Sequence, residues 1–85
     1  SGTAAMITIE TLDAAAAVRH VPALAEVLVD CVTNGASVSF MNPYTQADGE
    51  AFFSRVAGSV AAGETVLVAA FLGERIIGTA QLGLD

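Results

Sequence analysis

The side chains best suited to contact a ligand lie between residues 36 and 44, in the stretch Ala-Ser-Val-Ser-Phe-Met-Asn-Pro-Tyr. Phe40 and Met41 make this stretch unusually apolar for a connection, and connections that carry large apolar side chains usually cover a core or line a cleft. Beside them stand polar groups with the chemistry to orient a polar ligand, namely those of Ser39, Asn42 and Tyr44. Both interpretations, core cover and ligand contact, stay open.

Two further reactive side chains, Cys31 and His20, have no partner at a spacing typical of catalysis. Cys31 falls on the apolar face of an expected helix, which predicts a buried and inert thiol. His20 precedes Pro22 near an expected helix break, and we expect it at the surface. With one Cys and one His in the chain, the sequence predicts no internal disulfide and no metal site. We therefore assign no catalytic and no metal-binding residue.

The composition excludes several classes of partner. Of the 85 residues, 54% are hydrophobic and 14% charged, and three arginines against nine acidic residues give a net charge of −6. Without basic clusters, nucleic acid is excluded as a partner. The longest apolar run, 66–72, is far shorter than the roughly 20 residues of a membrane-spanning helix. We expect a cytoplasmic protein with no membrane contact. Such a short and apolar chain predicts a fragment, an oligomer, or both.

The first half of the chain predicts one strand and a broken helical region. Residues 1–5 are interpreted as a disordered tag remnant, and residues 6–85 as a single partial domain. A strand is expected at 6–12, followed by Asp13 as a helix N-cap. Helical periodicity runs from 14 to 33, but Pro22 cannot occupy a regular helix interior, so a second helical piece begins near it. Its buried face is expected to comprise Leu24, Leu28 and Cys31.

The second half predicts a helix and a hairpin. Thr45 and Asp48 have the spacing of a capping box, and the helix should stop at Gly63. The continuous apolar run 65–72 predicts a strand covered on both faces. Gly73 comes first in an expected two-residue type II′ turn. In the last strand, alternation places Ile76, Gly78, Ala80, Leu82 and Leu84 on one face, and Ile77, Thr79, Gln81 and Gly83 on the other.

The resulting order is β-α-α-β-β, an α+β fold with a mainly antiparallel sheet and two helices. This order and two sequence stretches resemble the N-terminal half of GCN5-related N-acetyltransferases, most closely their tabtoxin-resistance-protein-like members. The stretches are Asn-Gly-Ala-Ser-Val-Ser-Phe-Met at 34–41 and Ile-Gly-Thr-Ala-Gln-Leu at 77–82. Ser39 departs from these relatives, which tend to have glycine there. The resemblance covers the chain from about residue 6 to residue 85.

The resemblance implies an acetyl-CoA-dependent transferase that acts on a small-molecule amine. In that superfamily a Gly-rich turn after a fourth strand binds the pyrophosphate of acetyl-CoA, and the chain contains no such turn. The later tyrosine that serves as general acid is also absent, since Tyr44 lies far upstream. The chain alone is therefore expected to be inactive. The resemblance places the loop at 37–44 on the acceptor side of the cleft, and Gln81 of the last strand has the position to approach that cleft. The predicted substrate-binding residues are Ser39, Phe40, Met41, Asn42, Tyr44 and Gln81.

An alternative is a half-domain that was never an enzyme and that serves as a binding or assembly module. The strand expected at 75–84 would present an unpaired edge, and such edges invite strand addition. This alternative predicts a homo-oligomer, a dimer or larger, joined through that edge.

Overall fold

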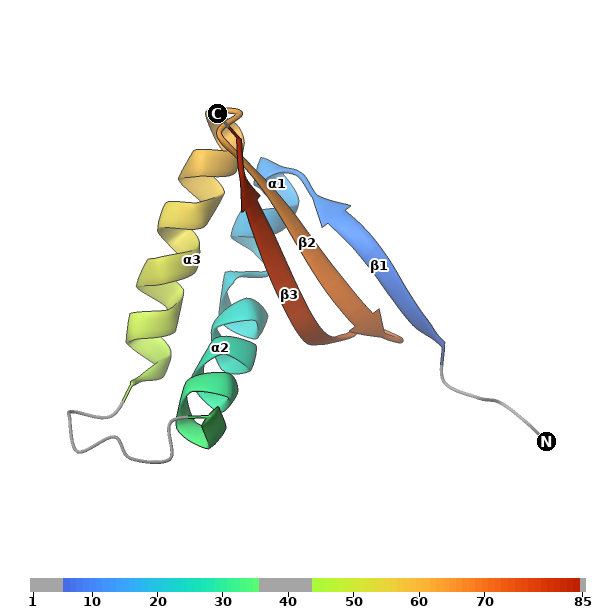
Figure 1. Ribbon diagram of the computed structural model, residues 1–85, viewed down its shortest axis with the longest axis vertical. Helices are drawn as coiled ribbons and strands as arrows, with labels where there is room; N and C mark the ends of the chain where they lie inside the picture. Colours follow the sequence, from blue (N-terminus) through green and yellow to red (C-terminus); the bar gives the residue numbers. More distant parts are fainter. Residues whose placement is uncertain (1–5, 36–43, 85) are drawn as a thin grey trace.

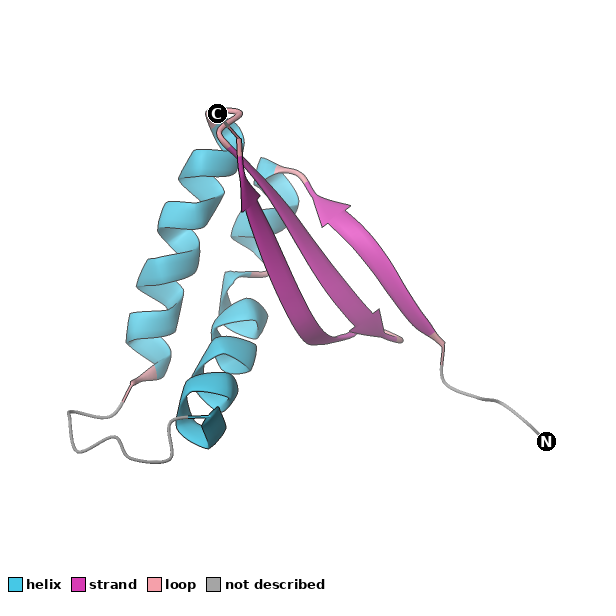
Figure 2. Cartoon of the chain, viewed as in Figure 1, coloured by secondary structure: helices cyan, strands magenta, loops and turns pink. Residues whose placement is uncertain are grey.

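The computed structural model describes residues 6–35 and 44–84, which form one antiparallel sheet with helices packed on one of its faces (Figures 1 and 2). The strands are β1 (Ile7–Leu12), β2 (Thr65–Leu72) and β3 (Arg75–Gly83), in the spatial order β1-β2-β3. The helices are α1 (Ala14–Arg19), α2 (Val21–Gly35) and α3 (Gln46–Ala61). The predicted α+β class with an antiparallel sheet is confirmed. The interpretation of residues 1–5 as a tag remnant lies outside the described residues.

The helical region between β1 and the loop is broken where the sequence predicts. The Asp13 carboxylate caps α1 by accepting a hydrogen bond from the backbone N–H of Ala16 at 2.8 Å. His20 follows the last residue of α1, and Pro22 falls in the first turn of α2, where its missing N–H costs no intrahelical bond. The described residues therefore contain three helices rather than two, because the break yields two separate helices.

Helix α3 begins with the predicted capping box. The Thr45 hydroxyl accepts a hydrogen bond from the Asp48 N–H at 3.1 Å, and the Asp48 carboxylate accepts one from the Thr45 N–H at 2.9 Å. The helix ends at Ala61, and Gly63 adopts a φ of 75°, which is the left-handed conformation that favours glycine. Both predicted ends of this helix are confirmed.

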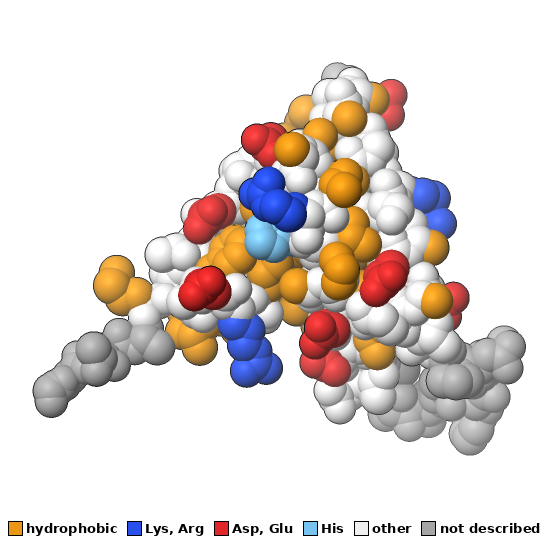
Figure 3. Space-filling view, turned by 180° about the vertical axis from the view of Figure 1, so that it is seen from behind, with side chains coloured by type: hydrophobic (Ala, Val, Ile, Leu, Met, Phe, Trp, Pro, Cys, Tyr) orange, Lys and Arg blue, Asp and Glu red, His pale blue; other side chains and the backbone are white. Residues whose placement is uncertain are grey.

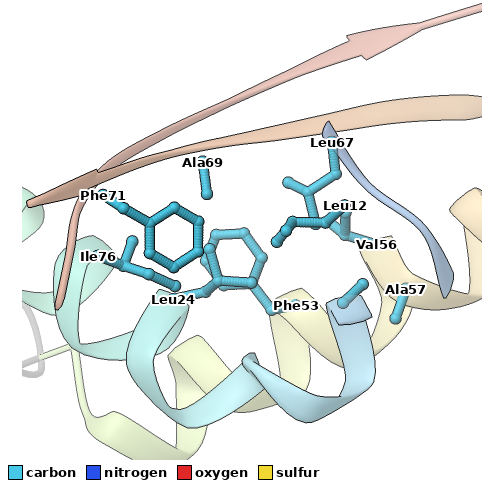
Figure 4. Close-up of a cluster of buried hydrophobic side chains, with 10 residues drawn as sticks. Leu12, Leu24, Phe53, Val56, Ala57, Leu67, Ala69, Phe71 and Ile76 are labelled. Carbon is cyan, nitrogen blue, oxygen red and sulfur yellow. The ribbon is translucent and has the colours of Figure 1, made fainter. Parts of the chain in front are cut away.

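The hydrophobic core lies between the helices and the facing side of the sheet (Figure 4). Leu24 of α2 and Leu67 of β2 are fully buried, and Phe53 of α3 is 2% exposed. Phe53 also packs edge-on against Phe52, with ring centroids 5.0 Å apart. Because these three large side chains come from three different elements, their burial holds both α2 and α3 against β2. The core cluster comprises Leu12, Ala17, Leu24, Phe53, Val56, Ala57, Leu67, Ala69, Phe71 and Ile76.

Strand β3 contains an irregularity that the predicted alternation missed. Phe71 pairs with Ile76 while Ala70 pairs with Gly78, so Ile77 is an extra residue on β3. One extra residue exchanges the faces on either side of it. Ile76 therefore points into the core at 6% exposure, whereas Gly78 pairs with a residue of the opposite face. The prediction that Ile76 shares a face with Gly78, Ala80 and Leu82 is wrong for this reason.

The β2–β3 turn has the predicted length and glycine position. Leu72 pairs with Arg75, which leaves two residues in the turn. Gly73 has a φ of 64°. Among the described residues only glycines have a positive φ, so the φ of Glu74 is negative. A type I′ turn needs positive φ at both positions, so the geometry agrees with the predicted type II′ turn.

The second face of the sheet has no covering layer within the described residues. Strand register places Ile7 and Ile9 of β1 on this face beside Leu72 and Ala70 of β2, and Leu82 of β3 beside Val66. Ile7, Ile9 and Leu82 are 59%, 66% and 63% exposed. The expectation that β2 is covered on both faces therefore holds for one face only. We call this side the open face.

Candidate functional site

The six predicted substrate-binding residues fall into two groups. Ser39, Phe40, Met41 and Asn42 lie outside the residues that the structure describes. Tyr44 and Gln81 lie within them, at the start of α3 and near the end of β3.

Tyr44 is half-buried beside the first turn of α3. Its hydroxyl donates a long hydrogen bond of 3.4 Å to the backbone carbonyl of Asp48. Gln46 anchors the same end of the helix, since its amide nitrogen donates to the Pro22 carbonyl at 3.0 Å and to the Glu50 carboxylate at 2.9 Å. The Tyr44 hydroxyl therefore has a local partner, and the described residues around it form a helix cap.

Gln81 borders a hollow of about 310 Å³ between α3 and the last residues of β3. Its register partner is Leu67, so its side chain lies on the helix-covered side of the sheet. The floor of the hollow is apolar and is formed by Phe52 and Val56, and its rim is polar. The residues that complete the lining are Arg55, Ser59, Thr65 and Gly83.

A second hollow of about 240 Å³ adjoins the first and shares Phe52 and Gln81 with it. Its other lining residues are Leu28, Phe53, Thr79 and Ala80. Tyr44 lines neither hollow. At 1.5 Å per residue, Phe52 lies about 9 Å along the helix axis from Gln46, the first residue of α3, and Tyr44 precedes Gln46 in the chain. The structure therefore does not bring Tyr44 and Gln81 together, and their roles as substrate ligands stay predictions.

Arg55 and Ser59 are polar groups of this region that the sequence analysis did not single out. They fall at positions three and seven after Phe52, so all three share a stripe of α3 with Val56. That spacing was readable in the sequence. The sequence does not show which strand end faces this stripe of α3. Only the packed fold places Gln81 opposite it.

Cys31 is exposed, so the prediction of a buried thiol is wrong. The apolar stripe of α2 continues through Cys31 in sequence, but the last turn of the helix extends past the β2–β3 turn (Figure 1) and has no sheet to cover it.

His20 is half-buried instead of fully exposed, and its ring meets Phe71 edge-on with centroids 5.6 Å apart.

The helix N-termini within the described residues do not fit a pyrophosphate group. Asp13 and Asp48 already cap α1 and α3, and each places a carboxylate where an anionic ligand would have to bind. The hydrogen bonds from the Thr45 backbone and hydroxyl lower the pKa of Asp48, which keeps this carboxylate ionised. Helix α2 has Pro22 in its first turn. The N-termini of the described helices therefore do not fit the pyrophosphate of acetyl-CoA.

Other kinds of site are also missing from the described part of the chain. No group of three or more His, Cys, Asp or Glu side chains is placed to hold a metal ion there. The basic side chains stand apart from one another among acidic ones (Figure 3). Within residues 6–35 and 44–84, no helix combines the length and the apolar character needed to cross a bilayer.

Comparison with known proteins adds no family assignment. No protein-family model matches the chain, and no curated protein matches it.

Proposed function

We propose that this chain is the N-terminal, acceptor-side portion of a GCN5-related, acetyl-CoA-dependent N-acetyltransferase that acts on a small-molecule amine in the cytoplasm. The observation that carries the proposal is the topology. One strand, a helical region, a long helix and an antiparallel hairpin follow in this order, and the first strand lies against the hairpin's first strand. The stretches at 34–41 and 77–82 add to this support.

The chain by itself is proposed to be inactive. Carboxylates close the N-termini of α1 and α3, and the glycines of the sequence form no phosphate-binding turn. Acetyl-CoA, the cosubstrate of the intact enzyme, would then bind to residues encoded after Asp85. Ser39, Phe40, Met41, Asn42, Tyr44 and Gln81 remain the proposed contacts for the amine.

The test is to read the gene beyond the codon of Asp85 and to compare two proteins. We expect the reading frame to continue into a Gly-rich turn. We also expect the extended protein to bind acetyl-CoA in calorimetry and to release coenzyme A thiol with an amine present. The 85-residue chain should do neither. Tight one-to-one binding of acetyl-CoA to the 85-residue chain would contradict the assignment of the donor site.

A second candidate function is a self-associating module, and the exposed β3 strand favours it. β3 is an edge strand of nine residues, and after Arg75 it carries no charged side chain that would discourage pairing. A homo-oligomer joined through this edge should dissociate on dilution in sedimentation runs. Leu82→Lys should shift it toward the monomer, while Ile7→Lys on the opposite edge strand should not. A monomer at all concentrations, together with a continuing reading frame, would remove this candidate.

A further inference from the structure

The hollow beside Gln81 contains the sole basic side chain of α3. Arg55 lies on the stripe of α3 that Phe52, Val56 and Ser59 also occupy, at spacings of three and four residues. None of the side-chain hydrogen bonds among the described residues involves Arg55. Arg55 therefore lines the hollow together with the apolar side chains of Phe52 and Val56, and no side chain or backbone group of the described residues accepts a hydrogen bond from its guanidinium.

The hollow lies between two elements that pack mainly on other parts of the fold. Helix α3 packs on β2 and on the other helices, whereas β3 packs on β2 and α2. Gly83 contributes no side chain to the lining, and a Cβ atom built there would meet nothing within 4 Å. The absence of a side chain at this position leaves room for a ligand beside Ser59 and Thr65.

We infer that this hollow binds a small organic monocarboxylate with an apolar body. The planar fork of Arg55 matches a carboxylate in a bidentate manner, and the Ser59 hydroxyl and the Gln81 amide supply neutral hydrogen bonds at the same rim. The apolar body lies over Phe52 and continues into the second hollow, which shares Phe52 and Gln81 with the first.

Size and charge narrow the ligand class. The two hollows, at about 310 and 240 Å³, together match the volume of ordinary small-molecule sites. The chain carries a net charge of −6, so phosphates and other polyanions are repelled, whereas one carboxylate can be neutralised by one arginine. Among anions, a monocarboxylate is therefore favoured, because its single negative charge matches the single positive charge of Arg55.

The inference does not rest on the proposed function, although Gln81 belongs to both proposed sites. It concerns the 85-residue chain itself and the middle and last turns of α3, whereas the proposed acceptor loop joins the first turn of that helix. An experiment that refutes the carboxylate site would not refute the proposed function, and the reverse also holds.

The experiment is a titration followed in amide NMR spectra of the nitrogen-labelled 85-residue chain. Sodium hexanoate is the probe, and hexanamide is its uncharged counterpart of equal length. We expect saturable shifts with hexanoate at the amides of residues 52–59, 65 and 79–83. The affinity for hexanoate should exceed that for hexanamide by about two- to fivefold, the range of an ion pair with an exposed arginine.

Two variants locate the site, and one serves as a matched control. Arg55→Gln should remove the preference for hexanoate over hexanamide. Arg19→Gln deletes the same charge on α1, outside both hollows, and should leave the preference unchanged. Gly83→Leu fills the hollow from a position without positive φ, so the spectrum should stay dispersed while both probes lose binding.

Three results would overturn the inference. The first is no saturable shift at the named amides with hexanoate. The second is equal binding of hexanoate by the Arg55→Gln and Arg19→Gln variants. The third is movement of the same amides when the protein alone is concentrated, which would identify a second copy of the chain as the occupant.

Discussion

Two glycines of α3 should respond in opposite directions to the same substitution. An alanine side chain at position 49 would place its Cβ atom 3.0 Å from the Cβ, 3.1 Å from the Cα and 3.1 Å from the carbonyl oxygen of Ala25. Ala25 is fully buried on α2 and cannot move aside without shifting that helix. At Gly58 the added Cβ atom would meet nothing within 4 Å. Position 58 is therefore a matched control in the same helix.

The magnitudes follow from two opposing effects. Replacing glycine with alanine inside a helix stabilises it by about 1 kcal/mol, and this gain applies at both positions. Overpacking a tight contact costs about 1–3 kcal/mol, and this loss applies at position 49 only. We expect Gly58→Ala to raise the free energy of unfolding by about 1 kcal/mol. Gly49→Ala should lie below Gly58→Ala by about 1–3 kcal/mol.

Urea unfolding followed by circular dichroism measures both variants against the parent chain. In thermal unfolding, the same difference corresponds to midpoints at least about 4 °C apart for a domain of this size. If Gly49→Ala proves as stable as Gly58→Ala, the close approach of α2 and α3 at Ala25 is refuted.

Four further predictions concern the cap, the turn and the thiol. Thr45→Ala should destabilise the chain by about 1 kcal/mol through loss of the N-cap. Because the pKa of folded Asp48 is lowered, its contribution is present above the unfolded pKa of about 4 and is lost as pH falls through the folded value. The stability difference between the parent and Asp48→Asn should thus shrink below about pH 4 in urea titrations, and a constant difference would count against the capping box. Gly73→Ala forces a side chain onto a φ of 64° and should cost about 1–2 kcal/mol, whereas an unchanged urea midpoint would contradict the turn geometry. Cys31 should react with a disulfide reagent in the native state at nearly the rate of the unfolded chain, and strong protection would contradict its exposure.

The features that the sequence predicted well are determined by residues close together in the chain. The Asp13 cap, the Thr45–Asp48 capping box and the turn at Gly73 each depend on groups three or fewer residues apart. Such contacts form whenever the local backbone allows them, so the residue types at these spacings are sufficient to predict the caps and the turn. The helix break near Pro22 is local in the same sense, because the ring lacks an N–H.

The features that the sequence missed depend on where elements meet in space. Ile76 turns into the core because a bulge adds Ile77 opposite the β2 ladder, and alternation alone cannot reveal an extra residue. Cys31 continues an apolar stripe but lies where the sheet has already ended. Arg55 and Gln81 share a hollow only because α3 crosses the end of β3. Of the predicted site, the sequence placed Gln81 on the face of the last strand opposite to Leu82, but it could show neither that the helices cover this face nor which residues surround Gln81 there.

The area and the composition of the open face help to decide between the two candidate functions. Strand β2 has eight residues, and three strands about 4.8 Å apart with about 3.4 Å per residue give a face of roughly 14 by 27 Å, or about 390 Å². Register assigns one charged residue of β2 and β3 to this face, Arg75, which pairs with Leu72 beside the hairpin turn. The other members there carry no charge and are Val66, Val68, Ala70, Leu72, Gly78, Ala80 and Leu82.

Pairing of two β3 edges would extend the sheet but leave this face in water, because edge pairing joins backbones in the plane of the sheet. Stacking two copies face to face would cover it, yet about 390 Å² is half of the roughly 800 Å² per partner that a stable interface buries. Self-association through the β3 edge therefore does not account for the apolar composition. A covering layer supplied by a longer chain does account for it, and this favours the proposal of a larger enzyme over that of an independent module.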